Sequence, residues 1–189
     1  MKRNRLIATM VIMMGLALCV QTGCSSTPSK GGDTPSQQVN ENVQIANPWR
    51  DITEAEAMKL FPGSFRVPSG AENVMWSVME TWSETLVQLS FDLNGESFTA
   101  REQVTKDKNA DISGMYYDWT QKDEITLKNW ADGKMKGTYY RFVGDDEWAD
   151  LCTWYDAEKG ISYSVSVTSK DLDGFDLQAI AEALGASEK

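Results

Sequence analysis

The chain has 189 residues, and its 18 lysines and arginines against 28 aspartates and glutamates give a formal net charge of −10. This excess of acid opposes binding to nucleic acid and to anionic lipid headgroups, so nucleic acid is not expected as a partner. The chain has no histidine, which removes the usual base of serine and cysteine triads and the commonest transition-metal ligand. Zinc sites and triad hydrolases are therefore not expected. We expect a protein that is not an enzyme, with no cofactor and no metal.

The N-terminus has the pattern of a signal peptide. Three basic residues, Lys2, Arg3 and Arg5, precede a run of fifteen residues, Leu6 to Val20, that carry no charge. A permanent membrane span needs about 20 apolar residues, so this run is short for one. We expect residues 1–23 to be removed.

The four residues after that run, Gln21-Thr22-Gly23-Cys24, resemble the lipobox of bacterial lipoproteins, although Gln21 stands where an aliphatic residue is usual. The resemblance implies cleavage before Cys24, diacylation of that cysteine and anchoring in the cell membrane with the protein facing outside. Two acyl chains are enough for stable anchoring. Cleavage by an ordinary signal peptidase, giving a secreted protein, and retention as an uncleaved signal anchor are the alternatives.

The remaining chain divides into a linker and one domain. Residues 24–46 hold the lipidated cysteine and a polar stretch with few large apolar groups, which predicts a disordered tether. Residues 47–189 are long enough for a single extracytoplasmic domain. Once Cys19 is removed and Cys24 is acylated, Cys152 has no partner for an intramolecular disulfide. We expect Cys152 to be a buried structural thiol rather than a nucleophile.

Local signals place a helix at each end of this domain. Thr53 and Glu56 form a capping box, which predicts a short helix that ends at Pro62-Gly63. Near the C-terminus, Leu177, Ile180, Ala181 and Leu184 recur with helical spacing before Gly185. Asp173 is the expected N-cap of this second helix, and Asp176 is expected to be an acidic residue of its first turn.

Between the helices, the apolar residues recur with a period of two, which is typical of antiparallel strands. Asn94-Gly95 predicts a tight hairpin that sets Phe91 opposite Phe98. Further hairpins are expected around Asp132-Gly133 and Glu158-Lys159-Gly160. In the strand 161–168, alternate serines predict one buried face and one solvated face. The expected fold class is α+β, a curved antiparallel sheet of about six strands with one or two helices packed on one face.

Short motifs in this region occur in a recognisable order. They are Asn47-Pro48-Trp49, Val67-Pro68, Asp111-Ile112-Ser113-Gly114, Cys152-Thr153-Trp154 and Ser162-Tyr163-Ser164-Val165. Together with the first helix, they resemble the extracytoplasmic domains of Gram-positive lipoproteins of the DUF4367 type, which are similar to regions outside the membrane in some anti-sigma factors. The resemblance covers about residues 46–186 and implies a non-catalytic surface module, without a set of catalytic residues to carry over.

Aromatic residues supply the candidate binding site. The chain has seven tryptophans, and exposed aromatic faces can stack on sugars or hold peptide side chains. Trp119 and Trp130 lie near expected strand ends, and Tyr116 and Tyr117 precede the first of them. We expect these four residues to contribute to ligand binding, with burial in the core as the alternative for each tryptophan.

Two other kinds of site, one for calcium and one for glycoside hydrolysis, also have candidate residues. The acidic groups Asp145-Asp146-Glu147 and Asp171-Leu172-Asp173 suit calcium by residue type, but the second lacks the later ligands of an EF-hand loop. Two carboxylates, such as Asp146 and Glu147 with another acid, are the minimum for glycoside hydrolysis, and among 28 acidic residues some pair meets that requirement by chance.

The expected function is therefore a membrane-anchored binding module for a cell-surface ligand or protein partner. The partners to consider are the lipid bilayer, through acylated Cys24, and a cell-wall glycan, a peptide or a membrane protein. The alternative is a sensory or regulatory ectodomain that works with a membrane signalling or anti-sigma system. A carboxylate-based cell-wall hydrolase is the remote alternative.

Replacing the lipidated cysteine tests the anchor. Cys24→Ala is expected to move the protein from the detergent phase to the aqueous phase, because the variant cannot be acylated. Phase partitioning and the mass of the mature protein measure this change. Unchanged partitioning together with an unchanged mass would contradict the assignment.

Overall fold

The computed structural model describes residues 47–62, 65–81 and 83–185, which belong to one compact unit spanning Gln44–Lys189. The expected signal peptide, Cys24 and the polar linker lie outside the described residues. Within those three ranges, no helix has both the length and the apolar character needed to cross a membrane.

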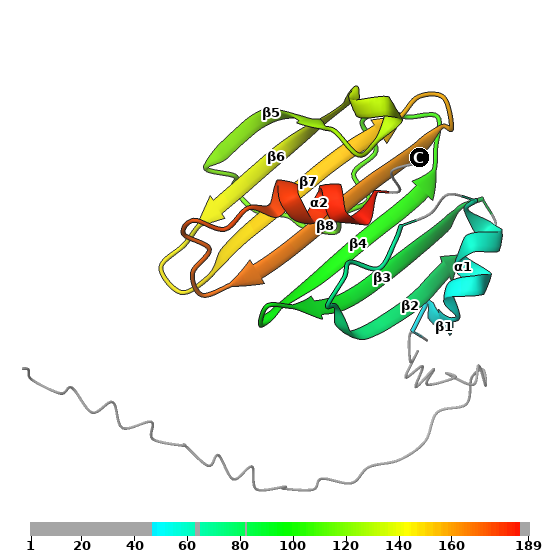
Figure 1. Ribbon diagram of the computed structural model, residues 1–189, viewed down its shortest axis with the longest axis horizontal. Helices are drawn as coiled ribbons and strands as arrows, with labels where there is room; N and C mark the ends of the chain where they lie inside the picture. The colour runs from blue at the N-terminus through cyan, green and yellow to red at the C-terminus, as the bar shows by residue number, and fades with distance from the viewer. Residues whose placement is uncertain (1–46, 63–64, 82, 186–189) are drawn as a thin grey trace, which may run out of the picture. The chain divides into compact units, whose positions relative to one another are not determined.

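The central element is an eight-stranded sheet in which every neighbouring pair is antiparallel. Its strands are β1 (Trp49–Ile52), β2 (Glu72–Glu80), β3 (Thr85–Leu93), β4 (Glu96–Val104), β5 (Gln121–Leu127), β6 (Met135–Val143), β7 (Trp148–Asp156) and β8 (Ile161–Ser169). The order across the sheet is β1-β2-β3-β4-β8-β7-β6-β5. Two four-stranded meanders are thus joined where β4 pairs with β8 (Figure 1).

The α+β class is confirmed, and the expected number of about six strands is too low. The strands without a clear sequence signal are β1, which has only four residues, and β2, whose first four residues are exposed. Neither strand shows a full alternation of apolar and polar residues, because each lies at or next to the edge of the sheet. The three expected hairpins are all present, and Phe91 pairs with Phe98 with ring centroids 5.1 Å apart.

The helices are α1 (Glu54–Leu60) and α2 (Leu177–Leu184), with a 3-10 turn, η1 (Ala131–Gly133), between β5 and β6. The capping box at Thr53 is confirmed, since the Thr53 side chain accepts from Glu56 N and the Glu56 carboxylate accepts from Thr53 N. The expected N-cap at Asp173 is wrong. Gly174 adopts a left-handed φ of 69°, which a helix cannot include, so α2 begins later and Asp176 caps it by accepting from Ala179 N at 3.1 Å.

The main core lies between the sheet and α2 (Figure 1). Leu177, Ala181 and Leu184 are fully buried, as their helical spacing predicts. Trp130 joins α2 to the β5–β6 connection, because its indole Nε1 donates to the Ala181 carbonyl at 2.9 Å. Cys152 is fully buried in the same core, as expected. Burial raises the pKa of its thiol, which therefore stays protonated and unreactive near neutral pH.

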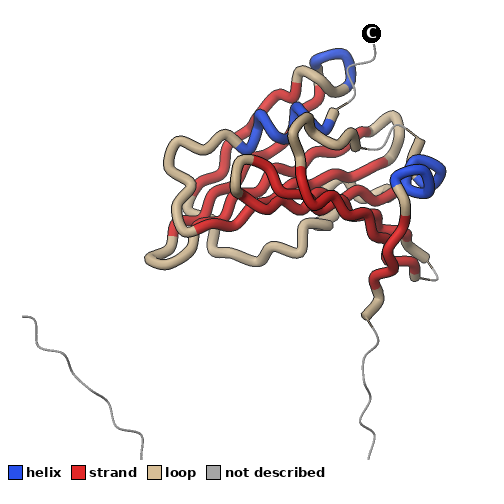
Figure 2. Tube along the Cα trace, turned by 60° about the horizontal axis from the view of Figure 1, so that its bottom comes forward, coloured by secondary structure: helices blue, strands red, loops and turns tan. Residues whose placement is uncertain are grey.

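The second face of the sheet is also covered, which overturns the expectation of a solvated face on β8. Ser162, Ser164 and Ser166 are 3%, 2% and 7% exposed. Residues 105–120, which we call the strap, connect β4 to β5 across this face. In Figure 2 the helices lie on one side of the sheet and an irregular segment runs along the other. The alternation of serines correctly identified the second face but could not reveal that a loop covers it.

The strand order requires this crossing. Strand β4 lies at the centre of the sheet and β5 at its edge, four positions away along β4-β8-β7-β6-β5. Because neighbouring strands lie about 4.8 Å apart, the strap has to span about 19 Å. The helix side of the sheet is occupied by the core, so the strap crosses on the opposite side.

A buried ion pair joins β6 and β7 on the helix side of the sheet. Asp150 is fully buried, and its carboxylate accepts from Arg141 Nε at 2.7 Å and from Arg141 Nη2 at 2.6 Å. The guanidinium also lies over the rings of Tyr139 and Trp148, 5.7 Å from each centroid. The hydrogen bonds from Arg141 to Asp150 raise the pKa of Arg141, so the guanidinium stays charged across the physiological range.

Removal of the arginine from this pair is expected to destabilise the fold strongly. Arg141→Gln leaves the buried Asp150 charge without its partner, which costs about 3 kcal/mol in the free energy of unfolding. The matched control is Arg50→Gln, because Arg50 and Glu80 form a similar pair at 3.0 Å with side chains 58% and 49% exposed. The control should change stability by less than about 1 kcal/mol. Urea denaturation measures both, and equal losses would contradict this account.

Candidate functional site

The strap is fastened to the sheet at its centre. Arg101, on β4, donates through Nη1 to the carbonyls of Ser113 and Ile112 at 2.7 and 3.3 Å, and through Nε to Gln88 at 2.9 Å. Its guanidinium also lies 5.4 Å from the centroid of the Trp49 ring. Burial lowers the pKa of Arg101, although an arginine remains charged under physiological conditions. A fixed cation thus holds two strap carbonyls against the sheet.

The strap also has its own internal structure. Asp111 Oδ1 accepts from the backbone N of Ser113 at 2.9 Å and from its hydroxyl at 2.6 Å. Ile112 and Ser113 are 7% and 4% exposed, so this turn is packed onto the sheet. At the start of the strap, Thr105 O accepts from the Tyr155 hydroxyl at 3.2 Å. These contacts make the strap a defined wall rather than a loose loop.

A cavity of about 740 Å³ lies between the strap and strands β5 to β8. This volume is within the range of about 300–1,000 Å³ that is usual for small-molecule sites. Because strand side chains alternate between faces, every second residue of these strands points toward the strap. The principal lining residues are Lys108, Asn109, Asp111 and Trp119 from the strap, with Lys122, Glu124, Lys136, Thr138, Tyr140, Thr153, Tyr155 and Ser162 from the sheet.

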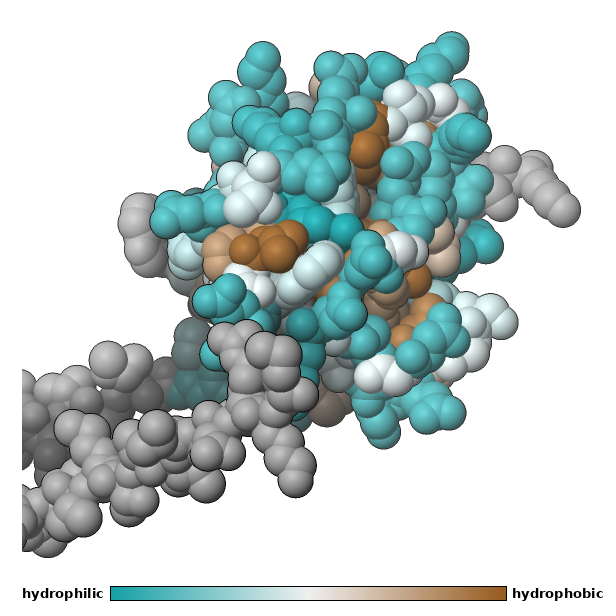
Figure 3. Space-filling model, turned by 90° about the vertical axis from the view of Figure 1, so that its left-hand side faces the viewer, coloured by the Kyte–Doolittle hydropathy of each residue, from teal (hydrophilic) through white to brown (hydrophobic). Residues whose placement is uncertain are grey.

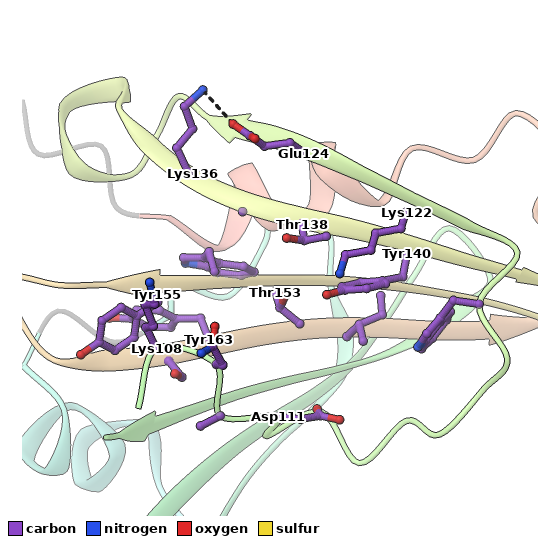
Figure 4. A pocket seen from close by; sticks show the side chains of 17 residues that line it. Lys108, Asp111, Lys122, Glu124, Lys136, Thr138, Tyr140, Thr153, Tyr155 and Tyr163 are labelled. Atoms are coloured by element: carbon purple, nitrogen blue, oxygen red, sulfur yellow. Dashed lines mark ion pairs between the residues drawn. The ribbon is translucent and has the colours of Figure 1, made fainter. Parts of the chain in front are cut away.

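The lining combines aromatic rings, hydroxyl groups and charges. At one end, Lys108 lies near Tyr155, and at the other end Lys122 lies over Tyr140, with Thr138 and Thr153 between them (Figure 4). The Lys122 ammonium is 5.3 Å from the centroid of the Tyr140 ring. Such a lining offers stacking surfaces and hydrogen-bonding groups to one ligand.

Ser162 contributes a polar atom with no hydrogen-bond partner in the described part of the chain. Its hydroxyl is buried, lies in the lining of the cavity and makes no hydrogen bond within those residues. A buried hydroxyl without a partner is costly, and a ligand oxygen in the cavity can satisfy it. This atom distinguishes the cavity from an ordinary surface hollow.

An aromatic cluster closes the cavity where the strap reaches β5. Trp119 lies 5.5 Å from Tyr140 and 5.5 Å from Tyr117, and Tyr117 lies 4.9 Å from Phe142, all measured between ring centroids. The Tyr117 hydroxyl donates to Glu147 at 2.6 Å, a bond that raises the pKa of the tyrosine. The cluster fixes the Trp119 ring in the lining.

The four aromatic residues singled out by the sequence have different places. Trp119 lines the cavity, and Tyr117 supports it from behind. Tyr116 is 86% exposed and lies in the strap next to them. Trp130 does not join this group, since it is 6% exposed and packs in the core beneath α2. Its position after β5 resembled a strand end, but the 3-10 turn folds it inward against α2.

Sequence reasoning missed the residues that the sheet contributes. Lys122, Tyr140 and Ser162 come from three strands, and only the strand order brings them together. The alternation of β6 places Lys136, Thr138 and Tyr140 on one face, which was a usable signal. Lys108 was indistinguishable from any other loop lysine.

Other candidate chemistries have separate locations. A second cavity of about 340 Å³ lies on the helix side, lined by residues that include Arg141, Phe175 and Gln178. Among the described residues, no group of three or more histidine, cysteine, aspartate or glutamate side chains is placed to hold a metal ion. Asp171 Oδ1 accepts from Asp173 N at 2.8 Å, so that acidic segment forms a turn before α2. On the side shown in Figure 3, hydrophilic residues dominate and hydrophobic ones are exposed only in small areas.

Comparisons with known protein families, with curated proteins and with solved structures found no match to this chain. The likeness to domains of the DUF4367 type therefore stays a prediction based on short sequence motifs. The site has to be interpreted from its own geometry.

A single methyl group added beside Arg101 tests how the strap is held. Gly114 has a φ of 70°, and a Cβ at this position would lie 2.5 Å from Arg101 Nη1. Gly114→Ala is expected to displace the guanidinium and to speed hydrogen exchange throughout residues 105–120. The control is Gly174→Ala, which has the same kind of backbone, with a φ of 69°, and no atom within 4 Å of the added Cβ.

Both variants carry the backbone cost of a left-handed alanine, about 1–3 kcal/mol. Only Gly114→Ala should accelerate amide exchange in the strap beyond the rest of the protein. Hydrogen exchange read by mass spectrometry compares the two. Equal exchange of the strap in both variants would show that Arg101 does not hold it.

Proposed function

We propose that this protein is a membrane-anchored extracytoplasmic lipoprotein whose folded domain binds a cell-surface ligand without converting it. The observation that carries the proposal is the cavity between the strap and the sheet, with Trp119 and Tyr140 in its lining and the Ser162 hydroxyl lacking a partner in the described residues. The charged and apolar pattern of residues 2–20, followed by Cys24, supports the anchor and the outward location.

The chemistry of the cavity favours binding over catalysis. The chain contains no histidine to act as a general base. Cys152 belongs to the core on the helix side, where its raised pKa keeps the thiol protonated. In the cavity itself, Glu124 lies 3.7 Å from Lys136, and Asp111 is occupied by Ser113. The cavity carboxylates thus have structural partners.

Loss of the Trp119 ring is expected to weaken ligand binding. In a screen of wall glycans and short peptides against the mature protein, NMR shifts of ligand-contacting amides should fall in the strap and in β5 to β8. Trp119→Ala should weaken the binding of any hit by about tenfold, since a stacking surface of the cavity is removed. Gln178→Ala, which alters the second cavity, should leave that affinity unchanged.

Two results would contradict the proposal. Hits that shift only residues of the second cavity would place the site on the other side of the sheet. Cleavage of a hit during incubation would show an enzyme rather than a binding module.

A further inference from the structure

The charges in the cavity define the class of ligand. Of its five charged side chains, Glu124 and Lys136 form an ion pair at 3.7 Å, and Lys136 also donates to the Thr126 hydroxyl at 2.8 Å. Asp111 accepts two hydrogen bonds from Ser113. Within residues 47–62, 65–81 and 83–185, no ion pair joins Lys108 or Lys122 to a carboxylate. Three lysines and two carboxylates in the lining leave the cavity a net charge of +1, and Lys108 and Lys122 lie at its two ends.

This local excess of positive charge stands out in a chain whose net charge is −10. At physiological ionic strength, charges farther away than about 8 Å are largely screened. The two lysines thus act on a ligand in the cavity more strongly than the acidic surface beyond it. Their positions at the two ends of one cavity give an acidic ligand a specific site.

The neutral groups between the lysines suit a sugar ring. Thr138, Thr153 and the Ser162 hydroxyl offer donors and acceptors along the sheet, and Asn109 offers an amide from the strap. Trp119 and Tyr140 supply aromatic surface at the Lys122 end. Aromatic faces stack on the C–H surface of a pyranose, while hydroxyl and amide groups bond to its oxygens. A planar base would leave most of these hydroxyl groups without partners.

We propose that the cavity binds an acidic saccharide, in which pyranose rings lie along Thr138 and Thr153 while carboxylate or phosphate groups meet Lys122 and Lys108. This inference rests on the proposed binding function and names its ligand class. Because the lysines lie at opposite ends of the cavity (Figure 4), a short acidic oligosaccharide engages both, whereas a single acidic sugar engages one.

The test compares sugars that differ only in the group at C6, which is neutral in one and acidic in the others. Galactose, galacturonate and galactose 6-phosphate are titrated into the mature protein, and trigalacturonate represents the acidic oligosaccharide. Galacturonate or galactose 6-phosphate should bind at least about tenfold more tightly than galactose, which corresponds to about 1.4 kcal/mol. Preference for one of the two acids identifies carboxylate or phosphate as the natural group. Trigalacturonate should bind more tightly than galacturonate.

Substitution of the lysines distinguishes the two ends. Lys122→Gln and Lys108→Gln should each weaken trigalacturonate binding by about tenfold, and the double variant should bind it no better than the wild type binds a neutral trisaccharide. The affinity for galactose should not change. Lys59→Gln, which removes an exposed lysine of α1, is the matched control and should have no effect.

Each failure has a distinct meaning. Equal binding of galactose and the acidic sugars in the cavity, or tighter binding of adenosine monophosphate than of any sugar, would overturn the acidic-saccharide inference and leave the binding function standing. Unaltered affinity in the double lysine variant would overturn it as well. Absence of shifts at the cavity residues with every compound of the broad glycan and peptide screen would instead contradict the proposed function itself.

Discussion

The position of β5 at the edge of the sheet is the constraint on which the rest of the structure depends. Since β4 is central and β5 is four strands away, residues 105–120 must cross β8, β7 and β6. The core beneath α2 already fills one face, so the crossing takes place on the other. A polar sheet face becomes one wall of a cavity, and the strap becomes the other. The candidate site is thus a consequence of the strand order.

Arg101 fixes the position of the strap on the sheet. It joins Gln88 of the sheet to two carbonyls of the strap and stacks on Trp49 of the edge strand. At the far end, the aromatic cluster around Trp119 packs the strap against β6. Strap residues on both sides of the Arg101 attachment, Lys108 to Asp111 and Trp119, line the cavity. Its walls are set before a ligand enters, which lowers the conformational cost of binding.

Most of the fold was predictable because its signals are local. The capping box at Thr53, the Asn94-Gly95 turn and the spacing of Leu177, Ala181 and Leu184 depend on neighbouring residues, and all are found as expected. The site was predictable only in part. Trp119 and Tyr117 were found from their aromatic character. Lys108 in the strap and Lys122 on β5 line opposite ends of one cavity, and only the strand order brings them there. Trp130 shows the limit of such reasoning, because residue type alone does not separate a core ring from a binding ring.

The central claim is that the space beneath the strap is a binding site rather than an empty gap. The most direct measurement is a crystal structure of the mature protein grown with trigalacturonate. The account predicts density for the saccharide between the strap and β5 to β8, with an acidic group near Lys122 and a ligand oxygen bonded to Ser162. A saccharide bound elsewhere, with the cavity filled only by ordered water, would contradict it.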